Sequence, residues 1–135
     1  MSVQARLRSE SKVEFLYTAR LLTVSVIKSC VDSKKGRYVE TVSKPVTEKA
    51  WEVYGHVKVG NSIYPTNQHE AQLRRDEFIL AKAKLHDLVS KIGVAHEFYH
   101  FSDHDLDEMC GFIDKELSLI EKILESDRKR YKNLP

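Results

Sequence analysis

Apolar side chains recur every three or four positions through four segments of the chain, which is the spacing of an amphipathic α-helix. The longest segment runs from Thr66 to Phe101, and we predict that it forms one continuous helix. It contains no proline, and a short polar side chain at Thr66 or Asn67 can accept a first-turn N–H and cap it. The predicted core stripe of this helix is Phe78, Ala81, Leu85, Leu88, Ile92, Ala95 and Tyr99.

The N-terminal segment predicts a second helix. Ser11 and Glu14 have the spacing of a capping box, in which the serine and glutamate side chains each accept a backbone N–H. The stretch Leu21–Ile27 is rich in β-branched residues and resembles a strand, but the length of the pattern and the capping box favour a helix. Its predicted core stripe is Phe15, Leu16, Ala19, Leu22, Thr23, Val26, Ile27 and Cys30.

Two more helices flank the longest one. Ser43 is expected to cap the earlier of them, with Pro45 in its first turn and Gly60-Asn61 as a left-handed C-cap. Ser102 and Asp105 form a second capping box, which is expected to start the later one. The expected core residues are Val46, Ala50, Val53, Tyr54 and Val57 in the earlier helix, and Leu106, Met109, Cys110, Ile113, Leu117, Ile120 and Ile123 or Leu124 in the later one.

Four amphipathic helices with mostly short connections predict an all-α fold, an antiparallel up-down-up-down four-helix bundle. The length of 135 residues predicts one domain, residues 1–135. A chain of this length can bury a hydrophobic core large enough to fold without disulfides or a structural metal. We expect the basic ends, about residues 1–10 and 127–135, to be loosely held. Cys30 and Cys110 lack metal-type spacing and are interpreted as two small buried hydrophobes rather than a disulfide.

No window approaches the roughly 18 apolar residues of a membrane span, and the N-terminus lacks the apolar region of a signal peptide. We therefore predict a cytoplasmic protein without a membrane partner. The net charge of +2 hides an uneven distribution, because residues 1–62 carry 11 basic and 6 acidic residues while residues 102–125 carry 2 and 8. This asymmetry suits a polyanionic partner or self-association between unlike faces, but ordinary solvated helix faces produce it as well.

The segment His96-Glu97-Phe98-Tyr99-His100 matches the HExxH signature of zinc hydrolases, in which two histidines one turn apart bind the metal. The signature arises by chance in a chain with six histidines, and no predicted strand is present to hold an extended peptide. No glycine-rich phosphate loop, nucleophile elbow or supported Cys–His pair accompanies it. We therefore predict no catalytic residue, no metal and no cofactor, and we keep a zinc hydrolase as a remote alternative.

Five short segments of the chain form a recognisable pattern through their order and spacing: Arg8–Lys12, Ala50–Tyr54, Asn61–Tyr64, Leu73–Arg75 and Ser126–Lys132. This pattern resembles a bacterial four-helix-bundle family that includes the accessory variability determinant of diversity-generating retroelements and proteins encoded in ribosomal RNA intervening sequences. The likeness covers nearly the whole chain.

The resemblance implies a non-enzymatic homopentamer that assists a reverse transcriptase and its template RNA, or an RNA/DNA hybrid, through phosphate contacts. Related sequences often place Trp and basic residues where this chain has Ile123, Leu124 and Glu125. A structural bundle that binds only protein therefore remains the main alternative. The basic residues expected to contact nucleic acid are Lys34, Lys35, Arg37, Arg74, Arg75, Arg128 and Arg130.

Overall fold

The chain is an all-α protein. The computed structural model describes residues 2–5, 10–34 and 37–135, and every regular element within these ranges is helical. Four long α-helices follow one another along the chain. A short 3₁₀-helix precedes the first of them, and a π-helical turn precedes the second. These elements are η1 (Glu10–Lys12), α2 (Glu14–Lys34), η2 (Val39–Ser43), α3 (Lys44–Ser62), α4 (Gln68–Tyr99) and α5 (Asp103–Arg130).

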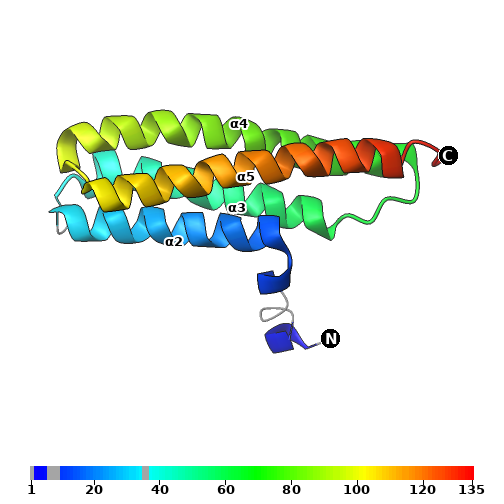
Figure 1. Cartoon of the computed structure of the whole chain (residues 1–135), viewed down its shortest axis with the longest axis horizontal. Coiled ribbons are helices and arrows are strands. Elements are labelled where there is room, and N and C mark those ends of the chain that lie inside the picture. The colour runs from blue at the N-terminus through cyan, green and yellow to red at the C-terminus, as the bar shows by residue number, and fades with distance from the viewer. Residues whose placement is uncertain (1, 6–9, 35–36) are drawn as a thin grey trace.

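The four long helices lie side by side along the longest axis of the molecule (Figure 1). Helix α3 packs most extensively against α4, and α2 packs against both α3 and α5, while α4 also contacts α5. One end of the molecule holds the end of α3, the start of α4, the end of α5 and the C-terminus; we call it the C-terminal end. The α2–α3 and α4–α5 connections lie at the opposite end. Within the described ranges no helix is long and apolar enough to cross a membrane.

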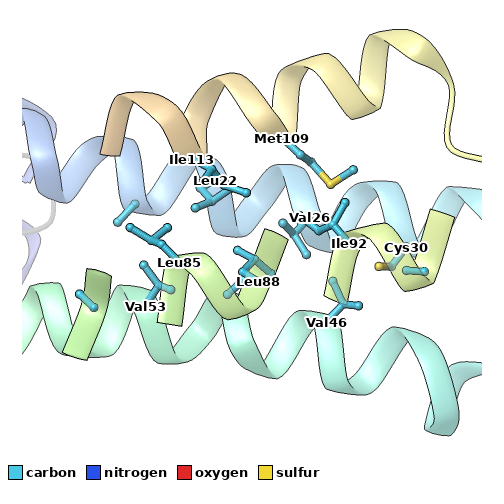
Figure 2. Close-up of a cluster of buried hydrophobic side chains, with 14 of the residues drawn as sticks. Leu22, Val26, Cys30, Val46, Val53, Leu85, Leu88, Ile92, Met109 and Ile113 are labelled. Atoms are coloured by element: carbon cyan, nitrogen blue, oxygen red, sulfur yellow. The ribbon is translucent and has the colours of Figure 1, made fainter. Parts of the chain in front are cut away.

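The predicted core stripe of α4 is confirmed, since all seven of its residues are buried. Side chains from the other three long helices meet it in the middle of the molecule, among them Leu22 of α2, Val53 of α3 and Ile113 of α5 (Figure 2). The partly buried Phe15, Tyr54, Leu106, Leu117, Ile123 and Leu124 pack against this core. Cys30 is buried as predicted, but the prediction for Cys110 is wrong, because its side chain is exposed. The core of α5 instead follows Met109, one position earlier.

Two of the predicted helix caps are confirmed. The side chain of Asn67 accepts a hydrogen bond from the amide of Glu70 at 2.9 Å and caps α4. Ser102 accepts one from the amide of Asp105 at 3.1 Å and caps α5. Each bond satisfies a first-turn amide that the helix itself leaves without a partner, which is why these helices begin where they do.

Two other caps were predicted wrongly. Ser11 lies inside η1, and α2 begins after Val13, whose carbonyl accepts the amide of Tyr17 at 2.9 Å. Ser43 has helical dihedral angles and makes no side-chain cap, because the π-helical turn leads directly into α3. Its amide donates to the carbonyl of Tyr38 at 3.1 Å, and its hydroxyl lies within hydrogen-bond distance of the Tyr99 hydroxyl.

Gly60 does not form the predicted left-handed C-cap, because α3 continues through it to Ser62. Gly60 is buried against the ring of Phe78 on α4. A Cβ atom at this position would lie 3.0 Å from the ring carbon Cζ, a tighter contact than nine in ten real Cβ atoms make. The close approach of α3 and α4 at the C-terminal end therefore favours glycine here.

Hydrogen bonds hold Glu10 and the C-terminal tail against the helices. Glu10 is buried, and its carboxylate accepts hydrogen bonds from the Tyr54 hydroxyl at 2.9 Å and the Lys58 ammonium at 2.5 Å. At the other terminus α5 continues to Arg130. The amide of Gln68 then donates to the Pro135 carbonyl at 2.9 Å. The C-terminal tail is thereby anchored to the start of α4.

Candidate nucleic-acid interface

The predicted basic residues that the structure describes lie at two opposite ends of the molecule. Arg74 and Arg75 lie near the start of α4, and Arg128 and Arg130 near the end of α5, so the structure brings these four together. Arg37 lies in the α2–α3 connection at the opposite end. Lys35 lies outside the described residues, as does the side chain of Lys34. The part of α4 from Arg75 to its end at Tyr99 separates the two groups by about 36 Å, at roughly 1.5 Å rise per residue.

Arg74 is not a surface cation, which corrects its assignment as a phosphate contact. Its side chain is 8% exposed, and its Nε donates to Oδ2 of Asp127 at 2.6 Å. Its Nη1 donates to the carbonyls of Gly60 at 3.2 Å and Ile63 at 3.1 Å. The planar guanidinium group can hold several acceptors at once, which a lysine cannot do in the same geometry. Arg74 therefore joins the ends of α3 and α5 to the start of α4.

Two aromatic rings complete the surroundings of Arg74. Its guanidinium carbon lies 5.1 Å from the centre of the Phe78 ring and 5.9 Å from that of Tyr131. A cation at these distances is attracted by the negative face of a ring. Tyr131 follows α5 directly, so this contact fixes the position of the basic C-terminal turn.

A groove of about 370 Å³ lies between the start of α4 and the end of α5. Three cationic side chains line it, those of Arg75, Arg128 and Lys132. The acid in its wall is Asp127, whose charge Arg74 already balances. Arg75 and Lys132 form no ion pair with any residue in the described part of the chain. The remaining polar lining comes from Gln68, Gln72 and Tyr131.

A second groove of about 440 Å³ lies on the other side of the same turn of α5, because Asp127 and Tyr131 line both grooves. Lys122 and Arg130 of α5 contribute its exposed cations. Its aromatic lining comes from Phe15 of α2, Tyr64 of the α3–α4 connection, and Tyr131. We call the five cations of the two grooves the basic end: Arg75, Lys122, Arg128, Arg130 and Lys132.

Two exposed acids lie beside the basic end. Glu14 lines the second groove and lies 3.4 Å from Lys115, so its charge is already paired. Glu125 lies 3.6 Å from Arg128 and 3.5 Å from Lys129, and all three side chains are at least 60% exposed. Exposed ion pairs of this kind contribute between 0 and about 1 kcal/mol, so a phosphate can displace the carboxylate. A hydrogen bond with Tyr131 raises the pKa of Arg130. This guanidinium therefore keeps its charge at every physiological pH.

At the opposite end Arg37 is exposed, and its guanidinium carbon lies 5.1 Å from the centre of the Tyr38 ring. Tyr38 adopts a left-handed conformation with φ of 60°. The hydroxyl of Tyr99 lies within hydrogen-bond distance of the carbonyls of Arg37 and Tyr38, at 3.0 and 3.2 Å. These contacts fix the backbone of the connection, in which Arg37 is the exposed arginine that the structure describes.

The HExxH segment is the end of α4 and the residue after it. The rings of His96 and His100 lie 6.4 Å apart, and His96 stacks on Phe101 with ring centres 5.9 Å apart. His100 has left-handed dihedral angles and ends the helix. In the described part of the chain, no group of three or more His, Cys, Asp or Glu side chains is arranged to hold a metal ion.

Sequence reasoning did not select Tyr64, Lys122, Tyr131 or Lys132, which the structure adds to the basic end. Lys132 lies in the basic tail and could have been chosen with Arg128 and Arg130. The position of Tyr64 depends on how the α3–α4 connection lies beside α5, and no pattern in the sequence reports that arrangement. None of the protein-family models, curated proteins or solved structures compared with this chain matches it.

Proposed function

We propose that this chain is an antiparallel up-down-up-down four-helix bundle that binds RNA at its basic end and catalyses no reaction. The observation that carries the proposal is the groove that collects Arg75, Arg128 and Lys132. Its lining contains one acid, Asp127, whose charge Arg74 already balances. Phosphate groups are the natural ligands of such a cluster, since each contact releases counterions from the nucleic acid. Arginine suits this role because its planar donors match two phosphate oxygens.

The scaffold behind the groove supports the proposal. The Arg74–Asp127 pair is buried and joins the two helices that carry the exposed cations. Gln68 binds the tail carbonyls through its side chain, including that of Tyr131 at 2.8 Å. Cations on a fixed framework lose less conformational freedom on binding than cations on a loose tail.

The biological role we propose follows the family resemblance: the protein accompanies a reverse transcriptase and its template RNA, and it acts as a homopentamer. A surface suited to self-association supports the second part. An apolar groove of about 560 Å³ lies between α2 and α3, lined by Ile27, Val31, Val39 and Trp51 among others. The side chains of Trp51 and Val31 are 57% and 63% exposed. Exposed apolar residues gathered in one groove are typical of protein–protein contacts.

Retention of a radiolabelled RNA on the purified protein, measured from low to moderate salt, tests the RNA part of the proposal. We expect the logarithm of the affinity to fall linearly with the logarithm of the salt concentration. Light scattering of the same sample measures its mass, for which we expect five copies. A stable monomer that retains no RNA at low salt contradicts both parts.

A second candidate is a bundle that binds only protein, and the exposed acidic face of α5 favours it. Asp107 and Asp114 are exposed on this helix, and α5 contributes none of the large exposed apolar side chains. In this case a basic neighbour would bind the face. Reversing both charges, by Asp107→Lys together with Asp114→Lys, would then disrupt assembly. Neither the unmodified protein nor the variant would retain RNA. Under the first candidate the same variant keeps RNA retention.

A further inference from the structure

One exposed aromatic ring stands beside the cations of the basic end. Tyr64 is 79% exposed, the largest exposed fraction among the exposed large hydrophobic residues of the described chain. It lines the groove that also contains Lys122 and Arg130. Within the described residues its ring packs against no other aromatic ring. A large apolar surface left in water at this position has no role in the core.

The backbone around Tyr64 is fixed although the ring is free. On one side, the carbonyl of Ile63 accepts a hydrogen bond from Arg74 at 3.1 Å. On the other side, Pro65 restricts Tyr64 to extended conformations, because the proline ring clashes with a preceding helical residue. The carboxylate of Glu70 then accepts hydrogen bonds from the amide and hydroxyl of Thr66, each at 2.7 Å. The loop therefore holds the backbone of Tyr64 in one place beside the groove.

Resting on the proposed function, we infer that the basic end binds an unpaired strand of nucleic acid and that one base stacks on the ring of Tyr64. Lys122 and Arg130 hold the backbone phosphates on either side of that base. Proteins that bind single strands combine a cationic groove with aromatic rings, because every base has a flat face that can stack. A duplex offers only its grooves and phosphates, since its bases are stacked on one another.

The binding of fluorescently labelled single-stranded RNA of about 12 nucleotides, within the site sizes of single-strand binders, tests this inference. A single-stranded DNA of the same sequence and an RNA duplex of the same length serve as the other probes. We expect Tyr64→Ala to weaken binding of both single strands about 5- to 150-fold and to leave duplex binding unchanged. Tyr64→Phe keeps the flat ring and is expected to bind single strands as the unmodified protein does.

Phe98→Ala is the matched control, because Phe98 is an aromatic residue 44% exposed at the opposite end of the molecule. We expect it to bind all three probes normally. If Tyr64→Ala binds single strands as tightly as the unmodified protein, the stacking inference is overturned while the proposed RNA binding stands. If the unmodified protein binds no probe at low salt, the proposed function and the inference both fail.

Discussion

Arg74 on α4 and Asp127 on α5 form a buried ion pair, with Nε and Oδ2 2.6 Å apart and 53 positions between them in the sequence. Both side chains are almost fully withdrawn from water, at 8% and 11% exposed. A buried pair of this kind is a weak source of net stability, but removing one member leaves an uncompensated charge in the protein. The pair therefore acts as a structural link beneath the basic end.

We expect Arg74→Met to lower the free energy of unfolding by about 3–5 kcal/mol, the usual cost of an orphaned buried charge. Urea unfolding followed by circular dichroism measures the change. The matched control is Lys82→Met, which breaks the exposed pair between Lys82 and Glu121 on the same two helices. That loss is expected to stay within about 1 kcal/mol. If both variants lose the same free energy of unfolding, the buried pair contributes no more to the structure than the exposed pair does.

The contact between Gly60 and Phe78 gives a second prediction. A methyl group at position 60 meets the Phe78 ring at 3.0–3.2 Å, and that ring is fully buried and edge-on to Phe15 at 5.7 Å. Because the ring has little room to move, Gly60→Ala is expected to destabilise the protein by about 1–3 kcal/mol, as overpacked cores do. Its melting temperature should fall accordingly.

Gly55→Ala provides the control on the same helix. A Cβ atom at Gly55 has no neighbour within 4 Å, so this substitution gains helix propensity without a clash. We expect it to stabilise the protein by up to about 1 kcal/mol. If both variants shift the melting temperature in the same direction, close packing at Gly60 is not the reason for the glycine.

Glu116 gives a prediction about pH. It lies fully buried on the core face of α5, and neither carboxylate oxygen has a hydrogen-bond partner within the described chain. Burial raises the pKa of this carboxyl from its ordinary 4.5 to about 8, and Lys115 opposes the change. Between these two pH values the folded state keeps a proton that the unfolded state releases. The free energy of unfolding therefore falls as pH rises through this window, by up to about 1.4 kcal/mol per pH unit.

We expect Glu116→Gln to remove this slope, so that the variant gains stability relative to the unmodified protein between pH 5 and 8. Urea unfolding at several pH values measures it. Asp87 affects the free energy of unfolding in the opposite direction, and it does so at lower pH. Hydrogen bonds from Lys91 and then Lys49 lower its pKa below the ordinary 3.8, so its contribution is lost only as pH falls further. An unchanged slope in Glu116→Gln would mean that Glu116 does not titrate as buried.

The sequence predicts the core well where one rule suffices. Helical periodicity identifies all the buried apolar residues of α4 from Phe78 to Tyr99, because a packed helix must turn one apolar face inward. The same spacing also includes Arg74, four positions before Phe78, and Glu116, between Ile113 and Ile120. Because both side chains are charged, the sequence pattern assigns Arg74 to the surface as a phosphate contact and leaves Glu116 out of the core stripe. A charged residue on a core stripe is the signal that finds them.

Other features depend on contacts between distant segments, which local patterns do not report. Gly60 looks like a helix terminator, but its role is set by a ring on the neighbouring helix. Ser43 has the residue type of a cap, but the π-helical turn before it removes the free helix start that a cap requires. The candidate site also contains a residue that local sequence patterns do not indicate. The sequence indicates the cations Arg75, Arg128 and Arg130, whereas Tyr64 joins them only through the fold.

The most direct measurement of RNA binding at the basic end compares Arg75→Ala/Arg128→Ala with Arg37→Ala. Arg75 and Arg128 line one groove, whereas Arg37 is an exposed arginine at the opposite end of the molecule. Fluorescence anisotropy with a labelled single-stranded RNA, repeated across salt concentrations, gives the affinity and its salt dependence. We expect the double variant to bind more weakly and its logarithmic salt slope to shrink by about 1.4, roughly 0.7 for each lost phosphate contact. Arg37→Ala should match the unmodified protein. Equal affinity and slope in all three proteins would contradict RNA binding at the basic end.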